Sequence, residues 1–203
     1  MTAIIDYGVG NLFSLKSSLS AVGEEAVVTS KVEDLNKADR LILPGVGAFR
    51  DARAALSSSG LVPCIMENAA KGKPLLGICL GMQLLFEKDY EDGIYEGLGL
   101  IPGEVRSISQ AIEPGLKIPH IGWNALSFRN RTQLFKYIKE NDHVYFVHSY
   151  HATGCEPYTT SVTDYGGILT ASVQRGNVYG TQFHPEKSAT VGLSILKAFV
   201  EIF

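Results

Sequence analysis

The segment 74–83 reads Pro74 Leu75 Leu76 Gly77 Ile78 Cys79 Leu80 Gly81 Met82 Gln83. It joins a short apolar run, typical of a buried strand, to residues that favour a helix. Cys79 lies between Gly77 and Gly81 in a Gly-x-Cys-x-Gly spacing. This is the spacing of a nucleophile elbow, a strained turn from strand to helix that holds the central side chain outward. We therefore predict a strand at 75–78, a helix after it, and Cys79 at the turn.

The residues before this segment alternate between short apolar runs and amphipathic stretches. We predict strands at 3–5, 26–29 and 40–43, and helices at 48–56 and 62–70. A further helix follows the first strand, with one apolar face made of Leu12, Leu15, Leu19 and Val22. Such alternation is typical of a parallel sheet with helices on both faces.

The pattern changes beyond residue 98 to short apolar runs broken by Gly, Pro and Asn. We predict antiparallel or mixed strands at 105–108, 118–128, 144–148, 158–162, 169–174 and 178–182. The chain closes with a predicted helix whose buried stripe is Gly192, Ile195, Leu196, Phe199, Val200 and Phe203. We find no repeat or linker. The predicted fold class is therefore α/β, a three-layer fold in one domain spanning residues 1–203, with a central, mostly parallel sheet, helices on both faces and extra antiparallel strands in the second half.

The composition limits the classes of ligand. The 203 residues are 45% hydrophobic, which is enough for one sizeable core. The formal net charge is -3, with 18 basic and 21 acidic residues scattered along the chain, so no basic patch indicates nucleic acid or an anionic membrane as a partner. There is no signal-peptide pattern, and no apolar run approaches the roughly 20 residues of a membrane helix. We expect a cytosolic protein that acts on a small molecule or another protein.

The cysteine pattern favours a free thiol. Cys64, Cys79 and Cys155 are an odd number at irregular spacing, which suits neither a disulfide framework nor a closed zinc site. A thiol at the start of a helix is stabilised as the reactive thiolate by the local positive potential. The alternative is that Cys79 is a small buried core residue, but its two flanking glycines favour the nucleophile. Cys64 and Cys155 lack such a setting, and we expect them to be core residues.

A candidate base lies near the other end of the chain, where a predicted strand runs into His184 Pro185 Glu186. Pro185 disfavours helix at His184, so the side chains of His184 and Glu186 can project to the same side. A carboxylate beside an imidazole fixes its tautomer and stabilises the imidazolium, as in a catalytic triad. The alternative is a surface histidine before a helix start, where Glu186 complements only the helix dipole. The linear order of nucleophile, histidine and acid differs from that of α/β-hydrolase esterases.

These motifs, together with four further blocks, resemble the class I (triad) glutamine amidotransferases over nearly the whole chain. The blocks are Asp6 to Asn11, Pro44 to Phe49, Pro119 to Asn124 and Tyr145 to Tyr150. They are most similar to the branch formed by the glutaminase subunits of imidazole glycerol phosphate synthase, an enzyme of histidine biosynthesis. Other branches typically carry a Gly-Gly rich oxyanion strand, so Gly45-Val46 favours this one.

The resemblance implies a triad and a substrate, L-glutamine. Cys79 attacks the side-chain amide, His184 protonates the departing ammonia, and water hydrolyses a γ-glutamyl thioester while Glu186 orients His184. It also implies an oxyanion hole from the backbone at Leu80, Gly45 and Val46. The substrate-binding residues that it implies are Gln83, Glu91, Ser149 and Tyr150. No cofactor or metal is implied.

The resemblance also implies a partner, a cyclase (synthase) subunit with a (β/α)8 barrel that uses the ammonia to make imidazole glycerol phosphate and an aminoimidazole carboxamide ribotide. A barrel needs about 250 residues of its own, so the partner must be another chain of a heterodimer. The interface residues implied by position are Asn11, Trp123, Asn124 and Lys187. For Trp123 the alternative is a core position, and for Lys187 an ordinary exposed lysine.

Three rival functions stay open at this point: another class I amidotransferase such as the anthranilate or pyridoxal phosphate pathway glutaminases, a non-catalytic interaction module on the same fold, and a cysteine peptidase. The blocks at Pro44 and Pro119 argue against the first rival, and the intact triad argues against the second. We also expect the isolated chain to be a poor glutaminase, because β-branched Val46 stiffens the predicted oxyanion loop.

Overall fold

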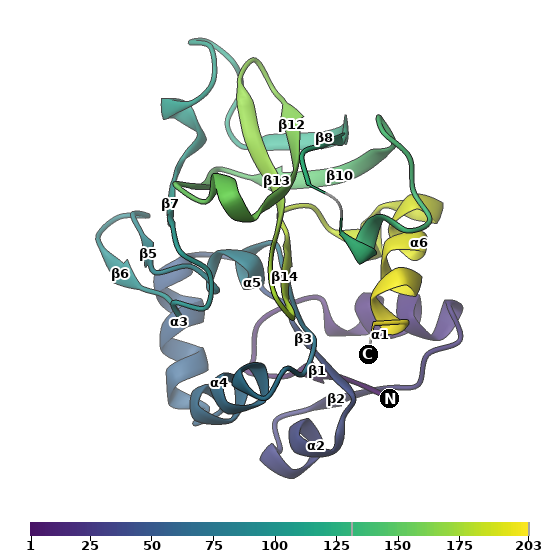
Figure 1. The fold of residues 1–203 in the computed structure, drawn as a ribbon. Coiled ribbons are helices and arrows are strands. Elements are labelled where there is room, and N and C mark those ends of the chain that lie inside the picture. The colour runs from purple at the N-terminus through teal and green to yellow at the C-terminus, as the bar shows by residue number, and fades with distance from the viewer. Residues whose placement is uncertain (131, 203) are drawn as a thin grey trace.

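An eight-stranded sheet runs through the computed structural model, which describes residues 1–130 and 132–202 (Figure 1). Its strands, in spatial order, are β2 (Ala26–Thr29), β1 (Thr2–Ile5), β3 (Arg40–Leu43), β4 (Leu75–Ile78), β14 (Val178–Thr181), β13 (Ile168–Arg175), β12 (Thr159–Asp164) and β9 (Ser127–Phe128). The strands from β2 to β14 pair in parallel, and β13, β12 and β9 continue the sheet in antiparallel pairs. Strands from both halves of the sequence therefore share one sheet, and the predicted parallel strands and extra antiparallel strands are both present.

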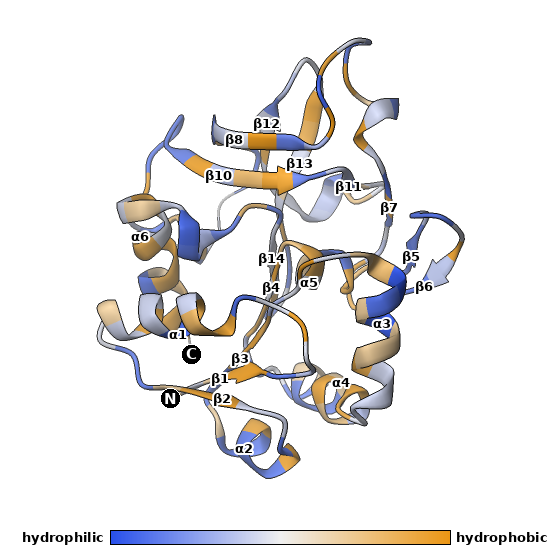
Figure 2. Ribbon diagram, turned by 180° about the vertical axis from the view of Figure 1, so that it is seen from behind, coloured by the Kyte–Doolittle hydropathy of each residue, from blue (hydrophilic) through white to orange (hydrophobic). Residues whose placement is uncertain are grey.

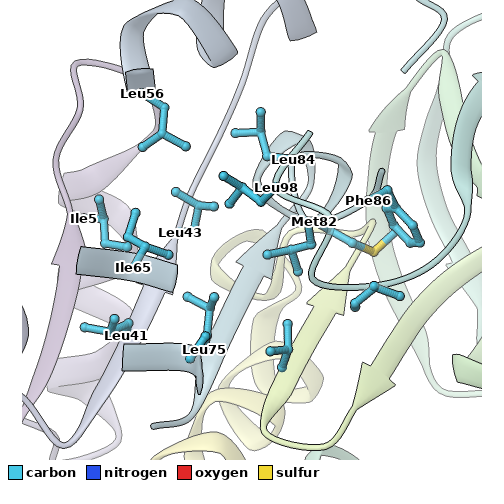
Figure 3. Close-up of a cluster of buried hydrophobic side chains, with 14 of the residues drawn as sticks. Ile5, Leu41, Leu43, Leu56, Ile65, Leu75, Met82, Leu84, Phe86 and Leu98 are labelled. Carbon is cyan, nitrogen blue, oxygen red and sulfur yellow. The ribbon is translucent and has the colours of Figure 1, made fainter. Parts of the chain in front are cut away.

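Helices cover both faces of this sheet (Figures 1 and 2). One face carries α1 (Leu12–Ala21) and α6 (Ala189–Val200), and the other carries α2 (Val32–Lys37), α3 (Phe49–Ser58) and α4 (Val62–Ala70). Because side chains alternate along a strand, consecutive residues pack into the hydrophobic clusters on opposite faces of the sheet. Leu75 packs in the cluster with α3 and α4, whereas Leu76 packs in the cluster with α1 and α6. Figure 3 shows the first cluster, with Ile65 of α4 beside the strand residues Ile5 and Leu41. This arrangement confirms the predicted three-layer fold.

Two small sheets lie beyond the main one. The first pairs β10 (His143–His148) with β8 (His120–Ala125), and the second has the order β11 (Tyr150–Thr153), β7 (Glu104–Ser107), β5 (Lys88–Asp89) and β6 (Tyr95–Glu96). The remaining helices of the part of the chain that the structure describes are α5 (Leu80–Gln83) and four short 3-10 turns, Ile108–Gln110, Gln133–Phe135, Glu156–Tyr158 and Pro185–Lys187. No helix among the described residues has the length and apolar character that crossing a bilayer requires.

Two sequence predictions differ from the observed elements. The strand predicted at 118–128 is two strands, because Leu126 leaves the ladder to bond the Asp142 carbonyl and β9 then pairs with β12 instead of β10. The short elements α2, β5, β6 and β11 were not predicted, since runs of two to six residues carry little periodicity. In the terminal helix Ile195, Leu196 and Phe199 are buried as predicted, whereas Phe203 lies outside the described residues.

The glycines of the central motif permit close backbone packing. A Cβ atom on Gly81 would lie 1.9 Å from the Leu43 carbonyl oxygen, and one on Gly77 would lie 2.6 Å from the Gly81 carbonyl oxygen. These distances are far below van der Waals contact, and the obstructing atoms are backbone atoms that cannot rotate away. The two glycines therefore let α5 pack directly on β3 and β4.

We predict that Gly81→Ala lowers the free energy of unfolding by more than about 3 kcal/mol, because overpacking against a fixed carbonyl forces β3 and α5 apart. Urea denaturation followed by circular dichroism measures this loss. The matched control is Gly23→Ala, where φ is +82° and no atom lies within 4 Å. The control should cost only about 1–2 kcal/mol of left-handed strain. Equal losses in the two variants would contradict the close packing.

Candidate active site

Cys79 occupies the strained turn between β4 and α5. Its φ of 54° and ψ of -112° are unusual for a residue with a side chain. The turn is held by a hydrogen bond of 2.7 Å from the Cys79 N–H to the Thr181 carbonyl of the neighbouring strand β14. The predicted elbow conformation is thus confirmed, and Cys79 is 7% exposed.

The helix after the elbow is short. α5 has only four residues, because the N–H groups of Leu85 and Phe86 bond the carbonyls three residues back, at Met82 and Gln83, and the α-helical pattern stops there. The carbonyls of Leu84 and Leu85 then accept bonds from Leu98 and Leu100. The N–H of Leu80 is at the first position of this helix, where backbone N–H groups have no partner within the helix. It therefore lies beside Cys79 as a donor for a bound anion.

His184 and Glu186 form a buried pair. His184 Nδ1 lies 2.7 Å from Glu186 Oε1, and both side chains are almost fully buried. Since a carboxylate only accepts, Nδ1 must carry the proton. Two hydrogen bonds hold the main chain of His184 and so help to position its imidazole. The His184 N–H donates to the Tyr145 carbonyl, and the Ser188 hydroxyl donates to the His184 carbonyl.

The charge state of His184 results from opposing effects. Burial lowers the pKa of His184, but the interactions with Cys79 and Glu186 outweigh burial and raise the pKa to about 9. The Cys79 side chain contributes to the raised pKa of His184 without a hydrogen bond of ordinary geometry between its sulfur and His184 Nε2. Nε2 has no hydrogen-bond partner among the described residues. An imidazolium with a free Nε2–H at neutral pH can donate a proton to a leaving group near Cys79.

A cavity of about 240 Å³ opens beside Cys79. Its lining residues are Gly47, Cys79, Leu80, Gln83, Glu91, Pro119, Val147, His148 and Ser149. It thus brings together five of the residues predicted for the site, from α5, the segment before β6, and the end of β10. The predicted site residues Gly45, Val46, Tyr150, His184 and Glu186 are not among those that line it.

The predicted oxyanion loop, residues 44–49, packs against the elbow. A Cβ atom on Gly45 would lie 2.7 Å from the Gly81 nitrogen and 2.9 Å from the Leu80 Cβ, so only glycine allows this approach. Val46 is 42% exposed, and Gly47 has a φ of +91°.

Two side chains fix the ends of this loop. The Tyr7 hydroxyl donates to the Pro44 carbonyl at 2.7 Å, and Glu91 Oε2 accepts from the Phe49 N–H at 2.6 Å. Burial, with a smaller effect of Cys79, raises the pKa of Tyr7, so the hydroxyl stays protonated as a donor. Tyr7 lies in the block Asp6 to Asn11 but was not predicted to have this role, and Glu91 was singled out only by resemblance.

Gln83 connects the cavity to the strands behind it. Its amide nitrogen donates to the Tyr150 carbonyl at 3.2 Å and to Gln182 Oε1 at 3.1 Å. The predicted substrate residues Gln83 and Tyr150 therefore touch each other.

Two histidines, His148 in the cavity lining and His120 beside it, were not predicted as site residues. His148 Nδ1 lies 2.8 Å from the Tyr150 carbonyl, and His148 Nε2 lies 3.1 Å from His120 Nδ1. Burial lowers the pKa of His148 to about 3 and of His120 to about 4, so both are neutral. A histidine within a predicted apolar strand has no local sequence pattern that would mark it as a residue next to the site.

The predicted interface residues lie at the surface. Trp123 of β8 is 51% exposed, its ring lies 6.1 Å from that of Tyr145, and Lys187 Nζ lies 6.0 Å from the same ring. We call these three residues the Trp123 surface. Asn124 donates to the Asp164 carbonyl, and Asn11 caps α1 by accepting from the Ser14 N–H.

The other two cysteines fit the core assignment. Cys64 and Cys155 are buried and unpaired, and burial raises the pKa of both thiols. The described residues contain no group of three or more His, Cys, Asp or Glu side chains that could hold a metal ion.

We predict that stability falls with rising pH between about 6.5 and 9. Folded His184 keeps its proton up to about pH 9, whereas an unfolded histidine loses it near the ordinary pKa of 6.5. The stabilisation is therefore complete below pH 6.5 and is lost as the pH approaches 9. In Glu186→Gln the folded pKa of His184 falls, so the decrease in unfolding free energy over this range should be smaller by about 1–2 kcal/mol. Urea titrations at both pH values test this, and an unchanged decrease would contradict it.

Comparisons with known proteins agree with this geometry. Residues 3–202 match the family model "Glutamine amidotransferase class-I". The chain is 46% identical over 203 residues to the imidazole glycerol phosphate synthase subunit HisH of Oceanobacillus iheyensis, covering 100% of this chain and 99% of that protein. It is 48% identical over 203 residues to the HisH subunit of Caldanaerobacter subterraneus subsp. tengcongensis, covering 100% and 98%. The structure of PurLQS from Thermotoga maritima is similar in fold, with a TM-score of 0.75 at 18% identity, covering 98% of this chain and 96% of that one.

Proposed function

Because the chain belongs to the class I glutamine amidotransferases and, within them, to the family of HisH subunits of imidazole glycerol phosphate synthase, we propose that residues 1–203 form one glutaminase domain that supplies ammonia to a separate cyclase in histidine biosynthesis. The observation that carries this proposal is the strained Cys79, which faces a cavity and interacts with the buried His184–Glu186 pair.

The triad performs two half-reactions. The Cys79 thiolate attacks the side-chain carbonyl carbon of L-glutamine, and the carbon–nitrogen bond then breaks as His184 Nε2–H donates its proton to the departing ammonia. A γ-glutamyl thioester remains on Cys79. Neutral His184 next takes a proton from water, which attacks the thioester, so that glutamate leaves and the thiolate is restored. Glu186 holds the imidazole in one orientation through both steps.

The oxyanion of each tetrahedral intermediate needs donors already in place. We assign one to the Leu80 N–H and the other to the loop at Gly45 and Val46, which packs on the elbow. Losing one such donor typically costs about 10²–10³ in rate. The stiffness of Val46 is the reason to expect slow turnover until the partner repositions this loop.

Two cavity residues, Glu91 and Ser149, together with Tyr150 next to Ser149, bind the amino-acid end of glutamine. Glu91 is acidic and suits the α-ammonium group, while the backbone at Ser149 and Tyr150 suits the α-carboxylate. Gln83 also lines the cavity. Glu91 also holds the Phe49 N–H, so occupancy of the site is coupled to the loop at 44–49.

The Trp123 surface, with Asn11 and Asn124, is our proposed contact with a (β/α)8-barrel cyclase chain in a heterodimer. Trp123 and its neighbour Ile121 are exposed in the same strand, at 51% and 58%. Exposed tryptophan beside an aromatic ring and a cation is typical of the residues that dominate binding energy at interfaces.

We predict that Cys79→Ala loses at least about 10⁴-fold of the glutaminase rate, measured as glutamate release in the presence of the cyclase, because Cys79 supplies the only thiol among the described residues that line the cavity. Cys64→Ala, a buried thiol on α4, is the control and should keep the wild-type rate. The same assay without the cyclase should give much slower turnover. A Cys79→Ala variant that still hydrolyses glutamine would disprove the proposed mechanism.

We predict that Trp123→Ala raises the dissociation constant for the cyclase about 10–100-fold, since it removes the largest exposed side chain of the proposed contact. Isothermal titration calorimetry gives this constant. Ile94→Ala, which removes an exposed apolar side chain in the turn between β5 and β6, should leave it unchanged. Equal affinities of wild type and Trp123→Ala would place the interface elsewhere.

A further inference from the structure

Gln182 lies directly behind the nucleophile and has no role in the reaction as described above. It follows β14, two residues before His184, and its side chain is 0% exposed. Its amide nitrogen lies 3.7 Å from Cys79 Sγ, within hydrogen-bonding range of a sulfur acceptor. Its backbone N–H donates to the Ala171 carbonyl at 2.8 Å, which anchors the residue to β13.

A chain of hydrogen bonds fixes which end of the amide faces the sulfur. The Tyr150 carbonyl can only accept, so the group of Gln83 that faces it is the amide nitrogen. The same nitrogen faces Gln182, so the atom of Gln182 that it meets is the carbonyl oxygen. The amide nitrogen of Gln182 is thereby directed at Cys79. The orientation follows from donor and acceptor chemistry alone.

Among the described residues, one acceptor and one donor lie within hydrogen-bonding range of the sulfur. The Val147 carbonyl lies 4.0 Å from Cys79 Sγ and can accept only from a protonated thiol. The Gln182 amide can donate to the thiolate. A buried anion without a donor is costly, and hydrogen bonds to charged groups are worth about 1.5–3 kcal/mol.

We propose that Gln182 is a positioning residue for the glutaminase reaction: its amide donates to the Cys79 thiolate and holds the sulfur toward the cavity, in an orientation set by Gln83. The proposal rests on the proposed function only in taking Cys79 as the nucleophile. Since Gln83 lines the cavity and Gln182 does not, substrate contact at Gln83 is transmitted to the sulfur through this pair.

Two near-isosteric variants separate this role from simple core packing. Gln182→Met removes both hydrogen bonds, whereas Gln182→Glu keeps the acceptor for Gln83 and puts an anion beside the sulfur. Thr163→Val is the matched control, because it removes one buried side-chain hydrogen bond, to the Ala125 carbonyl, from β12, two strands away from β14 in the sheet. Urea denaturation of each variant measures the cost to stability.

The first measurement is steady-state glutamine hydrolysis by the complex with the cyclase. We expect Gln182→Met and Gln182→Glu to lower kcat by about 10–100-fold, in line with the loss of a hydrogen bond to a charged group. For Gln182→Glu, which preserves the contact to Gln83, KM should change less than about threefold. Thr163→Val should keep the wild-type kcat. A kcat within twofold of wild type in both Gln182 variants would overturn the proposal.

The second measurement is the rate of Cys79 alkylation by iodoacetamide as a function of pH, on the full chain without glutamine. Gln182→Glu should need a higher pH than wild type for the same rate, because its carboxylate opposes the thiolate, and Thr163→Val should not. Superimposable profiles of Gln182→Glu and wild type would overturn the proposal. This assay uses no substrate, so it tests Gln182 even if the wild-type complex releases no glutamate, a result that would instead refute the proposed function.

Discussion

The contact between the backbone of the elbow and its two neighbouring strands is the constraint on which the rest of the structure depends. Cys79 has a backbone conformation that typically costs about 1–3 kcal/mol. It is maintained because Thr181 of β14 accepts the Cys79 N–H on one side, while Gly81 lies against the Leu43 carbonyl of β3 on the other. The position of one sulfur atom thus requires three adjacent parallel strands and two residues without side chains.

The order of the strands then explains how distant residues meet. Because β14 lies beside β4, the chain that leaves β14 carries Gln182, His184 and Glu186 past the sulfur. Because β3 lies on the other side, the loop that leaves it packs on Leu80. The small sheet of β8 and β10 closes the cavity from outside through Val147 and His148. The parallel strands point the same way, so their carboxyl ends gather the groups that the chemistry needs.

The same arrangement separates charged from neutral histidines within one region. His184 has a carboxylate partner and is protonated at neutral pH, whereas the hydrogen-bond partners of His120 and His148 among the described residues are each other and the Tyr150 carbonyl, so burial keeps them neutral. The fold places Glu186 beside His184, and this contact makes His184 the proton donor among the three histidines.

The sequence was sufficient for features that depend on local pattern. The strands that flank the elbow, the turn at Cys79 and the pairing of His184 with Glu186 follow from apolar runs, glycine spacing and a proline, each within a few residues. Features set by contacts between distant residues were not predictable in this way. The Gln182 amide contacts Cys79, which lies 103 positions away in the sequence. Glu91 accepts from Phe49, 42 positions away. Neither contact produces a periodic pattern in the sequence. The bonds from residues 98–101 to the carbonyls of Leu84 and Leu85, just after α5, likewise join segments that no local pattern connects.

The reactive identity of Cys79 is most directly tested by labelling the full chain, in complex with the cyclase, with a glutamine-analogue alkylator and locating the label by peptide mass spectrometry. The structure predicts one modified residue, Cys79, with labelling suppressed by excess L-glutamine. Cys64 and Cys155 should stay unmodified, because Cys79 lines the cavity and they do not. Labelling of Cys64 or Cys155 at a comparable rate, or labelling of Cys79 that glutamine does not suppress, would contradict the account.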